Sequence, residues 1–514
     1  MKTEKSEEKK HNVRKIICPY CCRSFEASQM VFRLKKSLQE EQKKEENKKE
    51  EQDGEQPFSK GLFSEQTSSE ERDSKIVDEK LKQYYEEFEE MDQKTAEDKA
   101  KVDAEAIEIN AADMLKDMED FNQEMLDKYG FVLELTYKGQ RLNKRLCPFC
   151  HNEMIPNAGL YDMKMIAMYG DTNSGKTVYL NVLEAVLRGD RRLASQGNAF
   201  NGSLFFEGTD DEQEEHNTNY NKLLSEHAML DATRGGKSVK PQVFRYSYKV
   251  KGEASSKTLL IVFRDIPGED TGKKSKLAKY SFYLRQADGI VVLLDATKLS
   301  SVMPLLGESR NVGGDFGTQA LGNLVTILTA VNGGGKTATP TAVVLAKADV
   351  LNGLHGDTKE LFEMELDPYK GYLDRKKIKK ANDTVKRVFE KLGENHIMDA
   401  VESCFSNYSY FAVSALGENP NMDEEGAQVE KISPWRVTEP FYWLLSKLNY
   451  IPYYHCEIWE NKKQERKKIE LFYYDWERNG SAQKQIADCK EKNKIKEKGF
   501  FGSKWKLVEK NDSI

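Results

Sequence analysis

The feature that most constrains this chain is the octapeptide Gly-Asp-Thr-Asn-Ser-Gly-Lys-Thr at residues 170–177. It follows an apolar run at residues 163–169 and precedes residues 178–183, whose composition is typical of a helix. The pattern G-x-x-x-x-G-K-[ST] between a strand and a helix predicts a loop that binds phosphate groups. The candidate phosphate-binding residues are Gly170, Asp171, Thr172, Asn173, Ser174, Gly175, Lys176 and Thr177.

The residue types of this loop suit phosphate binding. Gly170 and Gly175 let the backbone approach the phosphates, so that amide N–H groups and the helix N-terminus face the anion. Lys176 is expected to reach the terminal phosphates of a nucleotide, and the hydroxyl of Thr177 is expected to bind Mg²⁺. The alternative interpretation is an ordinary glycine-rich turn between a strand and a helix.

From about residue 160 the chain alternates between strand and helix patterns, which predicts an α/β fold with a mostly parallel sheet. A strand pair is predicted at residues 243–250 and 259–264, and the second strand leads into Asp265-Ile-Pro-Gly268. An aspartate at the end of a buried strand suits the water shell of Mg²⁺, and the Gly268 N–H group suits contact with a γ-phosphate.

Two later loops also follow predicted strands. The strand at residues 342–345 leads into Ala346-Lys347-Ala348-Asp349, and the strand at residues 410–413 leads into Ser414-Ala415-Leu416.

The four loops, taken in order, resemble those of the Ras-like (TRAFAC-type) P-loop GTPase superfamily. The resemblance implies binding of GTP and GDP with Mg²⁺. It implies that the stem of Lys347 lies along the guanine and that Asp349 accepts hydrogen bonds from the guanine N1–H and N2 amine groups. The backbone of the loop at 414–416 would touch the base. Ala346 departs from the asparagine or threonine of the superfamily.

The resemblance also implies a switch threonine and a residue that orients the attacking water. We expect Thr233 to be the switch residue that binds magnesium together with Thr177 and Asp265, with Thr209 and Thr218 as alternatives. Many members have glutamine after D-x-x-G, where this chain has Glu269. An acidic side chain there would repel the γ-phosphate, so slow hydrolysis that awaits a partner's positive group is expected.

Two C-P-x-C knuckles predict a metal site far from these loops in sequence. Cys18 and Cys21 form the first knuckle, and Cys147 and Cys150 form the second. Four thiolates make a closed tetrahedral site for structural zinc, so the knuckles are interpreted as two halves of one zinc ribbon. Cys22 and His151 are alternative ligands, and two unrelated pairs of reduced cysteines are the alternative interpretation.

The long insertion between the knuckles, residues 25–145, has a mixed composition. Residues 32–51 are dominated by Lys and Glu, and residues 52–74 are rich in polar and charged residues and predicted to be disordered. Apolar residues then recur at alternating four- and three-residue steps, which predicts a coiled-coil-like helical arm over 76–128. As one continuous helix the arm would be about 80 Å long, although a bend or hairpin between residues 92 and 106 is an alternative.

The knuckle Cys147-Pro-Phe-Cys150-His just before the first strand, and the continuation Gly175-Lys-Thr-Val-Tyr-Leu, resemble the bacterial double-GTPase group. Its members carry zinc-ribbon heads and are inferred to act with a second GTPase in conflict or stress systems. The resemblance therefore implies a protein partner, either a second GTPase or an effector. Self-association through the arm is also compatible with the sequence, and a solvated charged helix without a partner is the alternative.

The overall charge is modest. A net charge of −6 argues against a protein that coats nucleic acid. The basic, aromatic tail at residues 451–514 suits nucleic acid or a membrane surface, but we favour packing of its aromatic residues on the preceding domain. The N-terminus lacks the apolar segment of a secretory signal, and the later apolar runs are too short to span a bilayer, so a cytoplasmic protein is expected.

The predicted organisation has five parts. They are the first half of the ribbon (1–24), the insertion (25–145), the second half of the ribbon (146–158), the P-loop GTPase domain (159–450) and the tail (451–514). The predicted function is a GTP-binding, slowly hydrolysing switch that couples nucleotide state to a partner through the ribbon and arm. The alternatives are a nucleotide-binding scaffold with little hydrolysis and an ATP-using P-loop NTPase.

Overall fold

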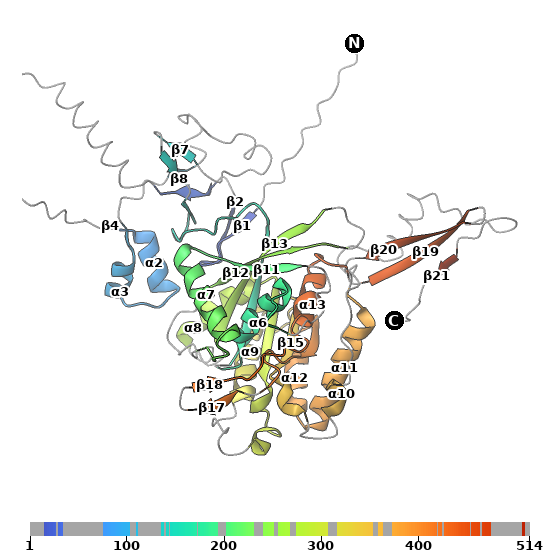
Figure 1. The fold of residues 1–514 in the computed structure, drawn as a ribbon. Coiled ribbons are helices and arrows are strands. Elements are labelled where there is room, and N and C mark those ends of the chain that lie inside the picture. Colours follow the sequence, from blue (N-terminus) through green and yellow to red (C-terminus); the bar gives the residue numbers. More distant parts are fainter. Residues whose placement is uncertain are drawn as a thin grey trace, which may run out of the picture. The chain divides into compact units, whose positions relative to one another are not determined.

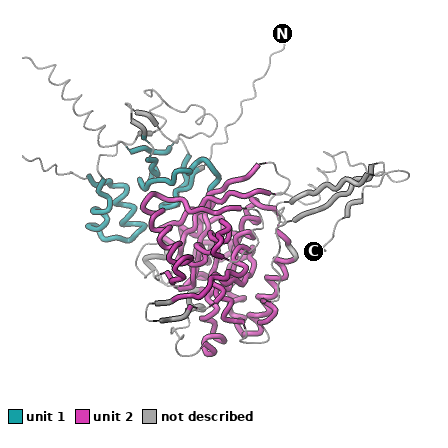
Figure 2. The backbone as a smooth tube through the Cα atoms, in the orientation of Figure 1, with its two compact units in different colours: residues 1–163 teal, residues 164–514 magenta. Residues whose placement is uncertain are grey.

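The structure is a computed structural model of the 514-residue chain. It describes residues 15–26, 29–33, 76–102, 109–110, 135–137, 140–142, 144–171, 173–193, 202–230, 240–250, 255–267, 274–306, 316–352, 358–362, 373–418, 420–423, 426–452, 454–462, 465–473 and 506–508. The chain divides into two compact units, residues 1–163 and 164–514, coloured separately in Figure 2.

The second unit is built on a seven-stranded sheet with strand order β11-β12-β13-β10-β14-β15-β16. Figure 1 labels β11, β12, β13 and β15 of this sheet. Its strands are β10 (Asp162–Gly170), β11 (Ser203–Glu207), β12 (Gln242–Tyr248), β13 (Lys257–Pro267), β14 (Gly289–Asp295), β15 (Thr341–Ala346) and β16 (Tyr408–Ala412). β10, β14, β15 and β16 pair in parallel, and β11, β12 and β13 pair antiparallel. The sequence-based prediction of an α/β fold with a mostly parallel sheet is confirmed, and the predicted strand pair is present as β12 and β13, which pair antiparallel.

The central strands of this sheet are apolar throughout. All residues of β14 and β15 are buried, as expected for parallel strands covered on both faces. The helices of the unit are α6 (Lys176–Arg188), α7 (Asp210–Leu224), α8 (Lys274–Gln286), α9 (Phe316–Val331), α10 (Lys359–Phe362), α11 (Arg375–Lys391), α12 (Asn395–Cys404) and α13 (Glu439–Lys447). The buried residues of α6 and α13 share one hydrophobic core with the strands, so the helix that follows the phosphate loop is anchored along its length.

Strand register places the functional loops at one edge of the sheet. Gly170 at the end of β10 pairs with Leu293 of β14, and Asp295 at the end of β14 pairs with Ala346 at the end of β15. Parallel strands bring their carboxyl ends together, so the loops after β10, β14 and β15 are neighbours. The loop after β14 continues as a short 3₁₀ turn, η3 (Ala296–Lys298), and the loop after β15 contains another, η6 (Ala348–Leu351). A third 3₁₀ turn, η4 (Met303–Leu305), follows η3 in the chain.

The C-terminal part of the second unit contains strands that the sequence analysis did not predict. β19 (Tyr454–Lys462) pairs antiparallel with β20 (Glu465–Tyr473) and with β21 (Lys506–Val508). A further hairpin joins β17 (Asn421–Asp423) and β18 (Gly426–Gln428). The tail is therefore partly a three-stranded sheet, and whether its aromatic residues pack on the preceding domain stays a prediction.

The first unit consists of small sheets and a helical hairpin. β1 (Lys15–Ile17) pairs with β2 (Ser24–Glu26), and β3 (Val31–Phe32) lies between β6 (Ile109–Asn110) and β9 (Arg145–Leu146). β4 (Ile76–Val77) pairs with β5 (Lys101–Val102), and β7 (Leu135–Tyr137) pairs with β8 (Gln140–Leu142). Between β4 and β5 lie α2 (Glu79–Glu87) and α3 (Gln93–Lys99).

Of the two forms left open for the arm predicted over 76–128, the described part has a helical hairpin and not one continuous helix, with the break between Glu87 and Gln93. Asp78 accepts a hydrogen bond from the Leu81 N–H group and begins α2, and Asp92 accepts one from Thr95 and begins α3. Each cap starts a new helix, and the β4–β5 pair closes the two helices into a hairpin. The first apolar series therefore serves packing inside this unit. Most of residues 103–128, like the disordered segment predicted at 52–74, lies outside the described residues.

Within the described part of the chain, no helix is both long and apolar enough to cross a membrane.

Candidate functional site

Two glycines shape the predicted phosphate loop. A Cβ atom at Gly170 would lie 2.7 Å from the Ser174 Oγ atom and 3.0 Å from the Leu293 carbonyl oxygen, so no side chain fits at this position. Gly175 has φ +89° and is the N-cap of α6. That conformation is favoured by glycine, and it leaves the first N–H groups of a 13-residue helix directed toward the loop. The backbone conformation therefore fits a phosphate group at the N-terminus of α6.

Lys176 lies across this loop. Its Nζ atom donates hydrogen bonds to the carbonyl oxygens of Gly170 at 2.7 Å and Asp171 at 2.9 Å. It also lies 3.5 Å from the Asp265 Oδ1 atom. The structure thus brings the predicted phosphate-binding lysine and the predicted magnesium-binding aspartate into contact, although they belong to segments that are far apart in sequence.

Asp265 carries a buried carboxylate oxygen that is poorly paired. Its Oδ1 atom has no hydrogen-bond partner among the described residues. Burial raises the pKa of the Asp265 carboxyl group, and the positive charge of Lys176 opposes that rise. The incompletely satisfied Asp265 carboxylate and the hydroxyl of the half-buried Thr177 offer oxygen ligands of the kind that Mg²⁺ prefers, so the chemistry of these residues fits the ion.

The predicted base loop is tied to the phosphate loop through Lys347. This residue has φ +56°, and its Nζ atom donates to the Asn173 carbonyl oxygen at 2.7 Å and to Asp295 Oδ2 at 2.6 Å. The lysine side chain therefore crosses from the end of β15 to the phosphate loop.

Asp349 is held by the third predicted loop. Its Oδ1 atom accepts a hydrogen bond from the Ser414 hydroxyl at 2.6 Å, and the Ser414 Oγ atom in turn accepts one from the Gly417 N–H group at 2.8 Å. Burial raises the pKa of Asp349, and the hydrogen bond from Ser414 opposes the rise. Leu416 is buried in the core and Ala415 packs against it, which fixes the backbone of this loop.

Four predicted site residues lie outside the described residues: Thr172, Thr233, Gly268 and Glu269. The two alternative switch threonines lie elsewhere. Thr209 is the N-cap of α7, where its side chain and that of Glu212 form a capping box. Thr218 is exposed on α7 and donates to the Glu214 carbonyl oxygen at 2.9 Å. Both hydroxyl groups therefore serve the helix in this structure.

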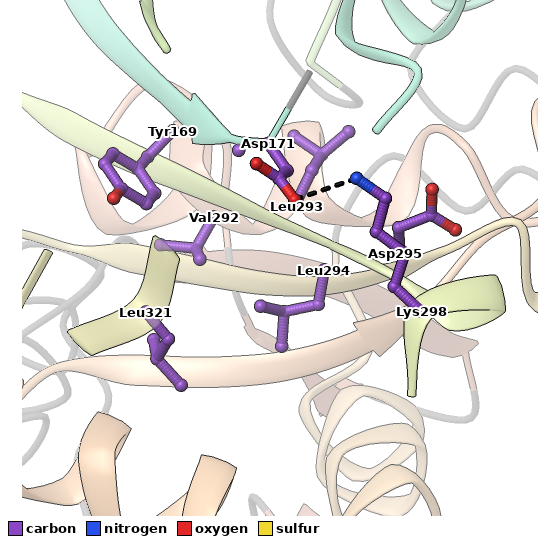
Figure 3. Close-up of a pocket in the computed structure, with 9 residues that line it drawn as sticks. Tyr169, Asp171, Val292, Leu293, Leu294, Asp295, Lys298 and Leu321 are labelled. Atoms are coloured by element: carbon purple, nitrogen blue, oxygen red, sulfur yellow. Dashed lines mark hydrogen bonds and ion pairs between the residues drawn. The ribbon is translucent and has the colours of Figure 1, made fainter. Parts of the chain in front are cut away.

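Two residues near the phosphate loop were missed by the sequence analysis. Asp295 is buried at the end of β14 and accepts from the Thr297 N–H and hydroxyl groups at 3.0 and 2.7 Å. Lys298 follows in η3, and its Nζ atom lies 2.8 Å from Asp171 Oδ2 (Figure 3). The available signal was the sequence Asp-Ala-Thr-Lys at 295–298, which directly follows a buried strand.

The predicted zinc knuckles converge in the first unit. The Sγ atoms of Cys18, Cys21, Cys147 and Cys150 all lie within 4.8 Å of one another, and all four residues are buried. The Cys18–Cys150 and Cys21–Cys147 Sγ separations are 3.7 and 3.8 Å. Thiolates about 2.3 Å from a tetrahedral zinc ion would be separated by about 3.8 Å, so this donor set fits zinc.

The alternative ligands are not part of that cluster. The His151 Nδ1 atom lies 2.9 Å from Asp78 Oδ2, and the Asp78 carboxylate also pairs with Arg33. Two cysteine sulfurs receive hydrogen bonds from the second knuckle, at 3.4 Å from the Phe149 N–H group and at 3.3 Å from the Asn152 side chain. Donors of this kind stabilise thiolate ligands, as the surroundings of a metal site commonly do.

Comparison with known protein families gives one match. The model of the family described as Double-GTPase 2 matches residues 164–424, half of the chain. No curated protein matches this sequence.

Solved structures that the comparison matches to this chain include a signal recognition particle receptor SRb-GTP/SRX complex from Chaetomium thermophilum, at 12% identity and a TM-score of 0.23, covering 51% of this chain and 95% of that chain. The Ski7 GTPase-like domain of S. cerevisiae, bound to GTP, has 13% identity and a TM-score of 0.27, covering 61% of this chain and 58% of that chain. A variant of Aquifex aeolicus Era bound to GDP.AlF4- has 15% identity and a TM-score of 0.22, covering 57% of each chain.

Proposed function

The chain belongs to the Double-GTPase 2 family, and from this premise we propose that it binds GTP and GDP with Mg²⁺ and hydrolyses GTP slowly. The observation that carries the proposal is the contact of Lys347 with the phosphate loop beside an Asp349 carboxylate held by Ser414. This arrangement supports recognition of guanine rather than of phosphate alone.

In the proposed complex, the amides at the N-terminus of α6 and the Lys176 ammonium group receive the phosphates. Moving Lys176 from two carbonyl oxygens to a phosphate exchanges neutral acceptors for a charged one, which favours the bound position. Thr177 and Asp265 would hold Mg²⁺, which supplies positive charge against the oxygens of the phosphates when it is bound. The ion would also satisfy the Asp265 Oδ1 atom, which has no hydrogen-bond partner among the described residues.

Asp349 would accept hydrogen bonds from the guanine N1–H and N2 amine groups. Adenine lacks that pair of donors, so an ionised carboxylate here disfavours it. Ser414 fixes the carboxylate through Oδ1 and leaves its second oxygen for the base. Ala346 offers no polar side chain to the nucleotide, and the contact between Asp295 and Lys347 compensates in part by restraining the lysine.

The switch part of the proposal rests on the sequence. Thr233 and Gly268 would close on the γ-phosphate and open after hydrolysis, and Glu269 would orient water less well than glutamine because of its negative charge. A protein partner, a second GTPase or an effector, would supply the missing positive charge. The four-cysteine cluster would bind structural zinc and hold the ribbon that presents the inserted hairpin to that partner.

The test is calorimetry with GTP, GDP, ATP and XTP on the wild type and on Asp349→Asn. We expect the wild type to prefer guanine nucleotides and the variant to shift its preference to XTP, because an amide can donate to the xanthine oxygen. Equal binding of ATP and GTP, unchanged in the variant, would contradict the proposal. Multiple-turnover release of phosphate from GTP that is abolished in Lys176→Ala would establish hydrolysis.

A further inference from the structure

The phosphate loop contains a negative charge that its proposed function does not require. Asp171 is the second residue of a loop whose backbone is arranged to receive anions, and its side chain is only 6% exposed. A buried carboxylate is costly unless it is paired, and it would repel a phosphate bound to the same loop. Its position needs a physical explanation.

Lys298 provides that explanation. Its side chain is 15% exposed, and its Nζ atom lies 2.8 Å from Asp171 Oδ2. Figure 3 shows the ammonium group directed at the carboxylate, at the side of a small cavity that is otherwise lined mostly by apolar residues of β10, β14 and α9. The second carboxylate oxygen, Oδ1, has no hydrogen-bond partner in the described part of the structure, so Lys298 carries most of the compensation.

Lys298 is fixed by the turn that begins at Asp295. Thr297 donates twice to the Asp295 carboxylate, which holds the turn after β14 in place. The same carboxylate receives Lys347, and Lys347 bonds the Asn173 carbonyl oxygen. The turn at 295–298 therefore restrains the phosphate loop twice, through the Asp171 side chain and, by way of Lys347, through the Asn173 backbone.

We propose that Lys298 is a positioning residue for nucleotide binding: by pairing with Asp171 it neutralises the phosphate loop and sets its backbone for the phosphate groups. This inference rests on the proposed nucleotide binding and extends it to the turn after β14. The carbonyl oxygen of Asp171 also accepts a hydrogen bond from Lys176, so a displacement of Asp171 would move the phosphate-binding lysine as well.

Single and double substitutions distinguish the effect of the charges of Lys298 and Asp171 on nucleotide binding from the effect of their ion pair on folding. Lys298→Met keeps an extended apolar side chain but leaves Asp171 unpaired, so nucleotide affinity should fall. The loss should be greater for a triphosphate than for a diphosphate, because the more highly charged ligand is repelled more strongly. Removing the second charge in Asp171→Asn/Lys298→Met should recover most of the affinity, which simple loss of an ion pair would not do.

The experiment is calorimetry at low ionic strength with GDP and the GTP analogue GppNHp in the presence of Mg²⁺. We expect Lys298→Met to bind GDP about tenfold more weakly, to lose more affinity for GppNHp, and to regain most of both in the double variant. Lys164→Met is the matched control. Its Nζ atom lies 2.7 Å from Asp288 Oδ1, but Lys164 lies near the opposite end of β10, so its nucleotide affinity should match the wild type.

Thermal unfolding of each variant, followed by circular dichroism, shows whether the variant is folded at the temperature of the binding measurement. The proposal would be overturned if Lys298→Met lost affinity for GDP and GppNHp by the same factor and the double variant recovered neither. It would also be overturned if Lys164→Met lost as much affinity as Lys298→Met. Wild-type affinity for adenine nucleotides equal to that for guanine nucleotides would contradict only the guanine assignment, and the charge comparison would then be decided with ADP and AppNHp. A folded wild type that binds no nucleotide would refute both.

Discussion

Gly170→Ala tests whether the phosphate loop is as tightly packed as its geometry implies. The added Cβ atom would meet the Ser174 Oγ atom at 2.7 Å and the Leu293 carbonyl oxygen at 3.0 Å. Ser174 is 1% exposed, so its side chain has little room to move, and the Leu293 carbonyl belongs to β14 in the middle of the sheet. Overpacking of this kind costs about 1–3 kcal/mol of unfolding free energy.

The same substitution should also weaken nucleotide binding. Moving the backbone away from Ser174 or Leu293 shifts the carbonyl oxygen of Gly170, which accepts a hydrogen bond from Lys176. We expect a lower midpoint in urea unfolding followed by circular dichroism, and weaker binding of GDP by calorimetry even at temperatures where the variant is fully folded.

Gly322→Ala is the matched control for this experiment. Gly322 is exposed in α9, and apart from its chain neighbours and the backbone of its own helix, no described atom lies within 4 Å of a Cβ atom built there. Alanine favours a helix interior over glycine by about 1 kcal/mol, so this variant should be more stable than the wild type. A Gly170→Ala protein as stable as the wild type, with unchanged GDP affinity, would refute the packing argument.

Three further outcomes are expected. The affinity for GDP should fall as the pH is lowered through the pKa of Asp349, because only the ionised carboxylate accepts hydrogen bonds from both guanine donors. Burial raises this pKa above the ordinary value of 3.8. Calorimetry between pH 4 and 8 checks the prediction, and the Asp349→Asn variant should lose this pH dependence. Elemental analysis should find about one zinc per chain, lost in Cys147→Ser, and zinc-free purified wild type would contradict the ribbon. Arg145→Met should lower the free energy of unfolding by about 2 kcal/mol or more, because the buried guanidinium group donates hydrogen bonds to three backbone carbonyls within residues 155–158. An unchanged melting midpoint would argue against that role.

The sequence by itself determined the parts of this protein whose requirements are local. A phosphate loop needs glycines, a lysine and a hydroxyl at fixed spacing between a strand and a helix, and residues 170–177 satisfy every position. The loops at Asp265, Asp349 and Ser414 each follow an apolar strand, and parallel pairing carries such loops to one edge of the sheet. Motif spacing and the position of each loop after a strand were therefore sufficient to nominate these loops as parts of one candidate site.

Tertiary structure decided the contacts that join segments without a local signal. Lys298 and Asp171 are ordinary charged residues in sequence, and their pairing depends on the register of β10 and β14. Tertiary structure also decided between a hairpin and one continuous arm, since a short apolar series can pack within its own unit or along a partner. The reason is that side-chain periodicity identifies a buried face, whereas the element that covers this face is set by how distant segments meet.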